Sequence, residues 1–106
     1  MSIIKYSKEH DLGTRFCWWF DISIQKLRTD PNYNQIIFEC YRPNREQGQL
    51  IHKYSISREI LLRELNKRTF STVRHGGREE VIRLEINRNH IDHRGMGSFD
   101  FSPFIV

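Results

Sequence analysis

The sequence predicts an α+β fold in which one antiparallel sheet of about four strands carries one helix on one face, in the chain order β-β-β-α-β. Two patterns support this prediction. Residues 15–25 alternate between apolar and polar side chains, which is typical of a strand with one buried face. Residues 58–69 repeat apolar side chains every three or four positions, which is typical of a helix packed on a sheet. The 106 residues have the mass of a single domain, covering residues 1–106.

The first long strand is predicted over residues 14–27. One of its sides is made of large apolar residues, namely Phe16, Trp18, Phe20, Ile22 and Ile24. The other side is polar at Arg15, Asp21, Ser23 and Gln25, and Trp19 is the exception on it. Two interpretations of Trp19 follow: another segment covers the indole, or the strand presents it to a partner. Residues 1–13 are interpreted as an edge strand or a loose arm.

Turn-forming residues separate this strand from the next two. Residues 28–34 contain Pro31 and Asn32, and residues 43–48 run from Pro43 to Gly48, so both segments predict tight reversals. Strands are expected over residues 35–41 and 49–55. Three strands joined by short polar reversals predict an antiparallel meander.

The helix is expected to begin after Ser57, a residue type that caps helix N-termini. Its buried stripe would consist of Ile60, Leu61 and Leu65. A fourth strand is predicted over residues 80–87, because apolar residues alternate there with charged ones. The tail, residues 98–106, is rich in apolar residues and is expected to pack back as a short edge strand.

Composition favours a cytoplasmic protein. The chain has no apolar run long enough to span a bilayer, and its first residues lack the apolar core of a signal peptide, so no membrane association is expected. Cys17 and Cys40 are therefore interpreted as reduced, packed thiols, with a disulfide between neighbouring strands as the alternative. The net charge of +4 comes from the C-terminal half, since residues 1–41 hold five basic and five acidic side chains.

The outer face of the sheet is the main candidate site. If the strands are neighbours, this face combines aromatic, basic and acidic residues: Arg15, Trp19, Asp21, Glu39, Tyr41, Lys53, Arg83 and Glu85. Trp, Tyr and Arg supply much of the binding energy at protein interfaces. We therefore expect a small non-enzymatic binding or regulatory protein that docks on a protein partner through Arg15, Trp19, Tyr41 and Arg83. The same surface without its acids would resemble a platform for stacking nucleic-acid bases.

A basic segment is the second candidate. Residues 66–78 contain four cations and no acid, and the cations are Lys67, Arg68, Arg74 and Arg78. Gly76 and Gly77 add flexible backbone N–H donors, so the segment has the chemistry of an anion or nucleic-acid site. The alternative function is thus nucleic-acid binding through the basic C-terminal half. The alternative interpretation gives these residues a purely structural role: the cations offset the helix dipole and the glycines form a turn.

Catalytic and metal sites are weaker hypotheses. His90 and His93 are the residue type that a metal-independent ribonuclease uses, but side chains three apart on an extended backbone point in different directions. Cys17 and Cys40 with these histidines lack the close ligand pairs of structural zinc sites. We therefore expect no metal and no cofactor. His52 is interpreted as a packed residue, because it shares strand parity with Leu50 and Tyr54.

Overall fold

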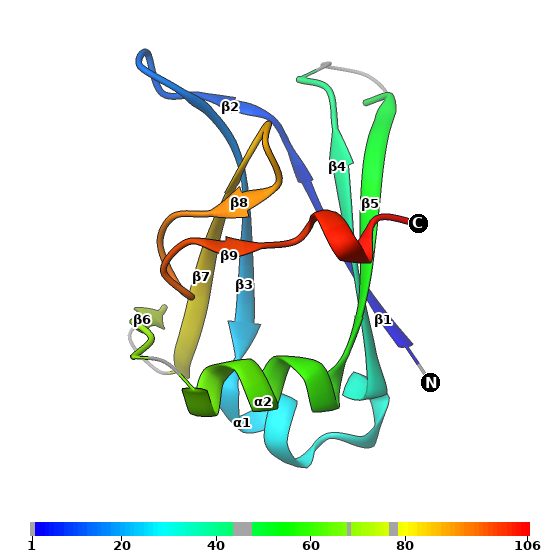
Figure 1. Cartoon of the computed structure of the whole chain (residues 1–106), viewed down its shortest axis with the longest axis vertical. Helices are drawn as coiled ribbons and strands as arrows, with labels where there is room; N and C mark the ends of the chain where they lie inside the picture. Colours follow the sequence, from blue (N-terminus) through cyan, green and yellow to red (C-terminus); the bar gives the residue numbers. More distant parts are fainter. Residues whose placement is uncertain (1, 44–47, 68, 77–78) are drawn as a thin grey trace.

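The computed structural model describes residues 2–43, 48–67, 69–76 and 79–106, without the side chain of His75. Within these residues, the strands form a three-stranded and a six-stranded sheet, accompanied by two α-helices (Figure 1). The predicted mixture of helices and mostly antiparallel strands is confirmed. The prediction of one sheet with about four strands is wrong, because the described strands divide between two sheets.

The three-stranded sheet consists of β1 (Ser2–Lys8), β4 (Gln35–Tyr41) and β5 (Leu50–Ser57). β1 runs parallel to β4 along its whole length, from Ser2 opposite Gln35 to Lys8 opposite Tyr41. β4 pairs with β5 in the antiparallel direction, as predicted. The N-terminal residues are therefore an edge strand of this sheet and not a loose arm.

The six-stranded sheet is built around β3 (Phe16–Ser23) and β7 (Glu79–Asn87), which pair antiparallel from Cys17 opposite Asn87 to Ser23 opposite Val81. The short strands β2 (His10–Asp11), β6 (Val73–His75), β8 (Ile91–Asp92) and β9 (Phe99–Asp100) complete it. The predicted meander is wrong at this point. The first long strand pairs with the strand over residues 79–87, and the strand over residues 35–41 belongs to the other sheet.

The chain changes sheets through two short helices, α1 (Ile24–Thr29) and the 3₁₀ helix η1 (Pro31–Asn34). The predicted strand therefore ends at Ser23 and not at Leu27. The hydroxyl of Ser23 accepts a hydrogen bond from the backbone N–H of Lys26 at 3.2 Å, which caps the helix. The helical turn then places Leu27 in the core. The carboxylate of Asp30 caps η1 in the same way.

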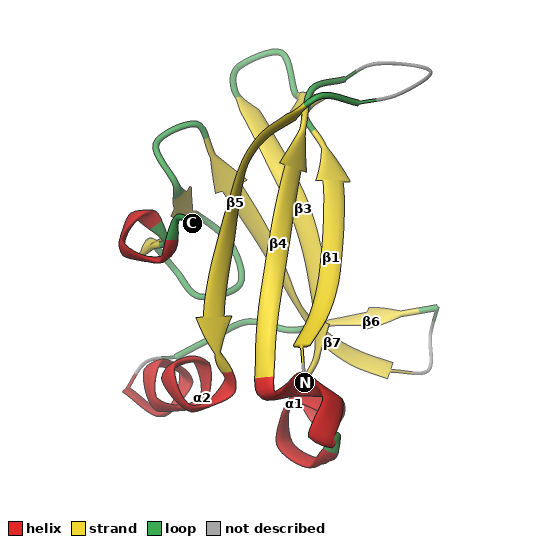
Figure 2. Ribbon diagram, turned by 90° about the vertical axis from the view of Figure 1, so that its right-hand side faces the viewer, coloured by secondary structure: helices red, strands yellow, loops and turns green. Residues whose placement is uncertain are grey.

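The second helix, α2 (Arg58–Lys67), begins where the sequence predicts, because the hydroxyl of Ser57 accepts from the backbone N–H of Ile60 at 3.2 Å. Leu61 and Leu65 form its buried stripe. Its position differs from the prediction. Figures 1 and 2 show α2 lying across one end of the two sheets, and it does not cover a sheet face.

The core lies between the two sheets. The rings of Phe20 on β3 and Phe38 on β4 pack edge to face with centroids 4.8 Å apart. The C-terminal residues close one side of this core: Phe101 is fully buried against Tyr54 and Phe38. In Figure 1, β8, β9 and the 3₁₀ helix η2 (Ser102–Phe104) cross from β7 to β5. The prediction that the tail packs back is confirmed.

Both cysteines are buried and free, in agreement with the interpretation as packed thiols. Burial, and secondarily Glu85, raises the pKa of Cys17 to about 11. Burial also raises the pKa of Cys40. Both side chains are therefore small apolar packing groups at neutral pH.

Candidate functional site

A groove of about 690 Å³ lies where β1 runs into β2 and where β4 ends. Its aromatic side chains come from three strands: Tyr6 on β1, Trp19 on β3 and Tyr41 on β4. Tyr6 is 77% exposed and Trp19 is 37% exposed. The structure thus brings together the two aromatic residues among those predicted to bind a partner, Trp19 and Tyr41, and it adds Tyr6 to them.

The N-terminal segment holds Trp19 in place and covers it only in part. The backbone N–H of Trp19 donates to the hydroxyl of Ser7 at 3.1 Å. The ring of His10 stacks on the indole with centroids 4.7 Å apart and an interplanar angle of 22°. Each of the two interpretations of Trp19 therefore describes part of the arrangement. A neighbouring segment packs on the indole, and more than a third of the residue still faces solvent.

Two ion pairs lie close to Trp19, and each of them includes a residue of the neighbouring strand β7. Arg83 donates two hydrogen bonds to the carboxylate of Asp21, at 2.8 and 3.0 Å. Arg15 donates to Glu85 at 2.9 Å, and Glu85 is buried. Arg15 and Arg83, both predicted to bind a partner, thus already have anionic partners within the chain.

The groove itself carries cations and aromatic rings. Lys8 and Arg42 line it together with His10, and none of its described lining residues has a carboxylate. Glu39 lies on the neighbouring part of β4, where it accepts a hydrogen bond from the Tyr41 hydroxyl at 2.8 Å. That hydrogen bond is the main reason why the pKa of Tyr41 is raised. Within the described residues, Lys8 and Arg42 form no ion pair.

A second pocket, of about 380 Å³, shares Arg42 with the groove. It is lined by Glu9, Trp18, Arg42, Ile51, His52, Arg88 and His90. The buried hydroxyl of Tyr54 connects its two imidazoles, at 2.9 Å from Nε2 of His52 and 2.6 Å from Nδ1 of His90. The two imidazole rings lie 4.9 Å apart and nearly perpendicular. Desolvation is the main cause that lowers the pKa of His52, and the nearby His90 lowers it further.

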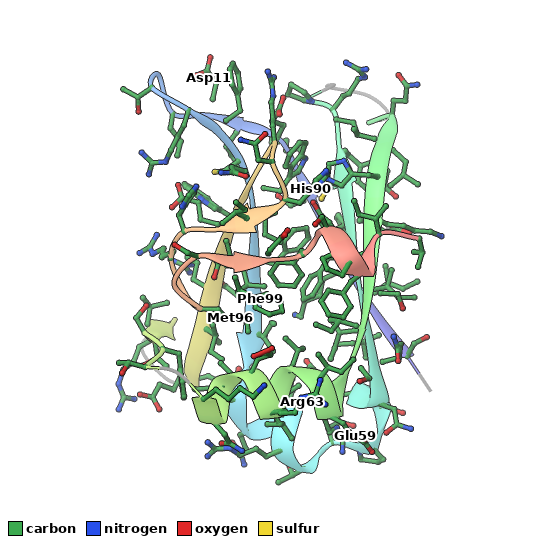
Figure 3. All side chains as sticks on the ribbon, in the orientation of Figure 1. Asp11, Glu59, Arg63, His90, Met96 and Phe99 are labelled. Atoms are coloured by element: carbon green, nitrogen blue, oxygen red, sulfur yellow. The ribbon has the colours of Figure 1, made fainter. Side chains whose placement is uncertain are left out.

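The turn after β7 gives His90 its position, as Figure 3 shows. His90 adopts a positive φ of 69°, which is uncommon for a residue with a side chain. The side-chain oxygen of Asn87 accepts from the backbone N–H groups of Asn89 and Ile91, at 2.8 and 3.0 Å, and so holds the turn closed. His93 is exposed and accepts a hydrogen bond from the Asn87 side-chain amide. The structure therefore joins His90 to His52 through Tyr54, and His93 does not line this pocket.

The predicted basic site lies at the other end of the molecule. Lys67 ends α2 and Arg74 lies on β6, both exposed and both away from β2 and the end of β4 (Figure 1). Arg68 and Arg78 fall outside the described residues. Gly76 has a φ of 62°, as expected for a glycine in a turn.

Four features of the site were not predicted from the sequence: Tyr6, Lys8, Arg42 and the role of His52 as a neighbour of His90. Tyr6 and Lys8 carry a usable signal, because Ile4, Tyr6 and Lys8 share strand parity and lie on the exposed side of β1. The contact of Tyr54 with His90 spans 36 positions and depends on how the two sheets face one another. Strand parity alone carries no information about that contact.

Comparison with protein families, with curated proteins and with solved structures found no match for this chain. Within the described residues, each helix is too short or too polar to cross a membrane. The geometry of the two pockets is therefore the basis for the function proposed below.

Proposed function

We propose that this protein binds single-stranded nucleic acid in the groove formed by Tyr6, Trp19 and Tyr41. The observation that carries this proposal is the combination of exposed rings with Lys8 and Arg42, in a groove without a described carboxylate. Bases of a single strand stack on aromatic side chains, and cations beside them pair with the phosphates. The groove offers both kinds of contact within one surface.

The pairing of the acidic residues is one reason to prefer nucleic acid to a protein as the ligand. The acids of the predicted sheet face favoured a protein partner in the sequence analysis. Asp21 is bonded to Arg83, and Glu85 is bonded to Arg15, so the charges of these two acids are compensated, whereas Glu39 is bonded to the Tyr41 hydroxyl. The cations at the groove, in contrast, have no described ion-pair partner, which favours an anionic ligand.

Docking on a protein remains the second candidate function, and one observation favours it. Ile4 is 58% exposed and lies beside Tyr6 and Trp19 along a hollow on the same side of β1. Exposed apolar side chains grouped in this way are typical of protein interfaces. A protein partner on this surface would carry acidic residues opposite Lys8 and Arg42.

Fluorescence anisotropy with labelled single-stranded oligonucleotides tests the first proposal. We expect binding at low salt that weakens as salt is added. Trp19→Ala should cost about 1–3 kcal/mol of binding free energy, the usual contribution of one stacked base. Tyr6→Ala should act in the same direction, and it removes a mostly exposed ring with little effect on folding.

The matched control uses cations far from the groove. Lys8→Ala with Arg42→Ala should reduce the slope of log affinity against log salt by about 1.4, because each phosphate contact contributes roughly 0.7 for a single strand. Arg28→Ala with Arg63→Ala removes the same charge from exposed positions on α1 and α2, and it should leave that slope nearly unchanged.

Two outcomes would contradict the proposal. One is the absence of binding at low salt; capture of an acidic protein that survives nuclease treatment would then favour the second candidate. The other is loss of affinity in Arg74→Ala with Arg78→Ala while the groove variants bind normally. That result would assign nucleic-acid binding to the basic segment.

A further inference from the structure

Two imidazoles line the pocket beside the groove. One buried hydroxyl contacts one nitrogen of each ring and leaves the other nitrogen of each ring free. Tyr54 uses its hydroxyl to contact Nε2 of His52 and Nδ1 of His90. Among the described residues, Nδ1 of His52 and Nε2 of His90 have no hydrogen-bond partner. Both imidazoles line the same pocket. No buried side-chain nitrogen among the described residues lacks a partner, so these two nitrogens are accessible to a ligand.

The single proton of the Tyr54 hydroxyl constrains the tautomers of both rings. The hydroxyl donates to one histidine and accepts from the other, so in the neutral state one ring shows the pocket a lone pair and the other an N–H group. If Tyr54 donates to His90, His52 has its lone pair on Nδ1 and His90 has its proton on Nε2. A base and an acid are thus present together while both rings are neutral.

We infer that His52 and His90 cleave RNA that is bound in the groove, with the 2′-hydroxyl as nucleophile. This inference rests on the proposed binding of single-stranded nucleic acid and names its substrate as RNA. His52 Nδ1 takes the proton of the 2′-hydroxyl, whose oxygen attacks the adjacent phosphorus. The bond from phosphorus to the 5′-oxygen breaks, and His90 Nε2 gives its proton to that oxygen. The products are a 2′,3′-cyclic phosphate and a free 5′-hydroxyl.

Protons within the Tyr54 network balance this step. The Tyr54 proton moves to Nδ1 of His90, and the Nε2 proton of His52 moves to the Tyr54 oxygen, so both rings end neutral with their tautomers exchanged. The exchanged state suits hydrolysis of the cyclic phosphate. His90 Nε2 then takes a proton from water, whose oxygen attacks phosphorus, and His52 Nδ1 returns a proton to the 2′-oxygen. The two steps together restore the starting tautomers.

The surroundings of the pocket fit an anionic substrate. Arg42 lines both the pocket and the groove, so one strand can reach both sites past the same guanidinium. Arg88 donates two hydrogen bonds to Glu9, at 2.8 and 3.0 Å, and Glu9 is buried, so this carboxylate is compensated. The lowered pKa of His52 keeps its imidazole neutral near pH 7, the form that a general base requires.

Tyr54 is a positioning residue in this scheme, because it acts through the histidines. Without the Tyr54 hydroxyl, turnover requires one imidazole to be protonated and the other to be neutral. We therefore expect the cleavage rate of the natural chain to rise with pH and then level off. Tyr54→Phe should instead give a bell-shaped pH profile. A purely structural role would change the rate at every pH by a similar factor.

The experiment uses the full chain with a 5′-labelled single-stranded RNA and the matching DNA, in the presence of EDTA. RNA should be cut to products with 2′,3′-cyclic phosphate ends, whereas DNA, which lacks the nucleophile, should be bound and left intact. His52→Gln and His90→Asn should each reduce the cleavage rate by about 100-fold or more without weakening binding. Asn tolerates the positive φ at position 90, and thermal unfolding checks that each variant is folded.

His93→Gln is the matched control, because it removes an exposed imidazole that does not line the pocket and keeps an acceptor for the Asn87 amide, and it should leave cleavage unchanged. RNA that is bound but remains intact would overturn this inference and leave the proposed function standing. Absence of RNA binding would overturn both. Cleavage that persists in the His52 and His90 variants, or that depends on His93, would also overturn the inference.

Discussion

At the scale of single residues, the role of a side chain depends on the groups that it contacts. Trp19 was identifiable in the sequence, because a large aromatic residue on the polar side of an alternating strand is unusual. His52 was not identifiable as part of a site, since its parity with Tyr54 predicts packing equally well. What distinguishes it in the structure is the Tyr54 hydroxyl, which it shares with His90.

The environment of His52 predicts how stability depends on pH. Desolvation, and then His90, lower its pKa from the ordinary 6.5, and Glu9 opposes this effect only in part. As pH falls through 6.5, the unfolded chain takes up the proton before the folded chain does. This contribution to the free energy of unfolding is therefore complete above 6.5 and is lost progressively below it.

His52→Asn should consequently reduce the loss of stability between about pH 7.5 and about pH 5.5. Urea unfolding of the natural chain and the variant at both pH values measures the difference. His93→Ala is a suitable control, because this imidazole is exposed. Equal pH dependence in the natural chain and His52→Asn would contradict the account.

At the scale of elements, the strands were more predictable than their partners. The strand over residues 35–41 has the predicted bounds, and the strand at Glu79 begins one residue before its predicted start. Local alternation and turn residues are sufficient for this, because they depend on neighbouring positions. Pairing was mispredicted for the first long strand. Its alternation continues formally to Ile24, and the pattern has no sign that Ser23 caps a helix that leads to another sheet.

The role of Ser23 as a helix cap is testable. Ser23→Ala removes the acceptor for the Lys26 N–H and should lower the free energy of unfolding by about 0.5–2 kcal/mol. Ser2→Ala provides the control, since Ser2 is exposed and its side chain has no hydrogen bond to another described residue. Chemical denaturation measures both. A Ser23→Ala variant as stable as Ser2→Ala would show that the cap is not what ends β3.

At the scale of the whole molecule, two sheets share one core, and the C-terminal residues close it. β2 and the end of β4, which lie beside the groove, are at one end of this arrangement, whereas α1, α2 and β6 lie toward the other (Figure 1). The histidine pocket shares Arg42 with the groove, and β6 carries the exposed Arg74. This layout was not predictable from the sequence. Trp19 and Tyr41 meet in one groove because β1 lies between their strands, and no local pattern specifies that position.

Phe101 tests how far the fold depends on the C-terminal segment. Its ring is fully buried and packs on rings from β4 and β5. Phe101→Ala should therefore lower the free energy of unfolding by about 3–5 kcal/mol. Val106→Ala changes a side chain that is 67% exposed, and its effect should stay within about 0.5 kcal/mol. Thermal or urea unfolding that shows equal effects would contradict the described packing.

The most direct test of nucleic-acid binding uses the two indole N–H signals in an NMR titration at low salt with single-stranded DNA, which the protein should bind and leave intact. Trp19→Phe assigns the signals. The Trp18 indole is buried, donates to the Tyr41 carbonyl at 2.9 Å and lines the histidine pocket, so its signal reports indirect effects of a strand that stacks on Trp19. We expect the Trp19 signal to shift to saturation and to shift further than the Trp18 signal. If the Trp19 signal stays in place throughout the titration, the groove does not bind the strand.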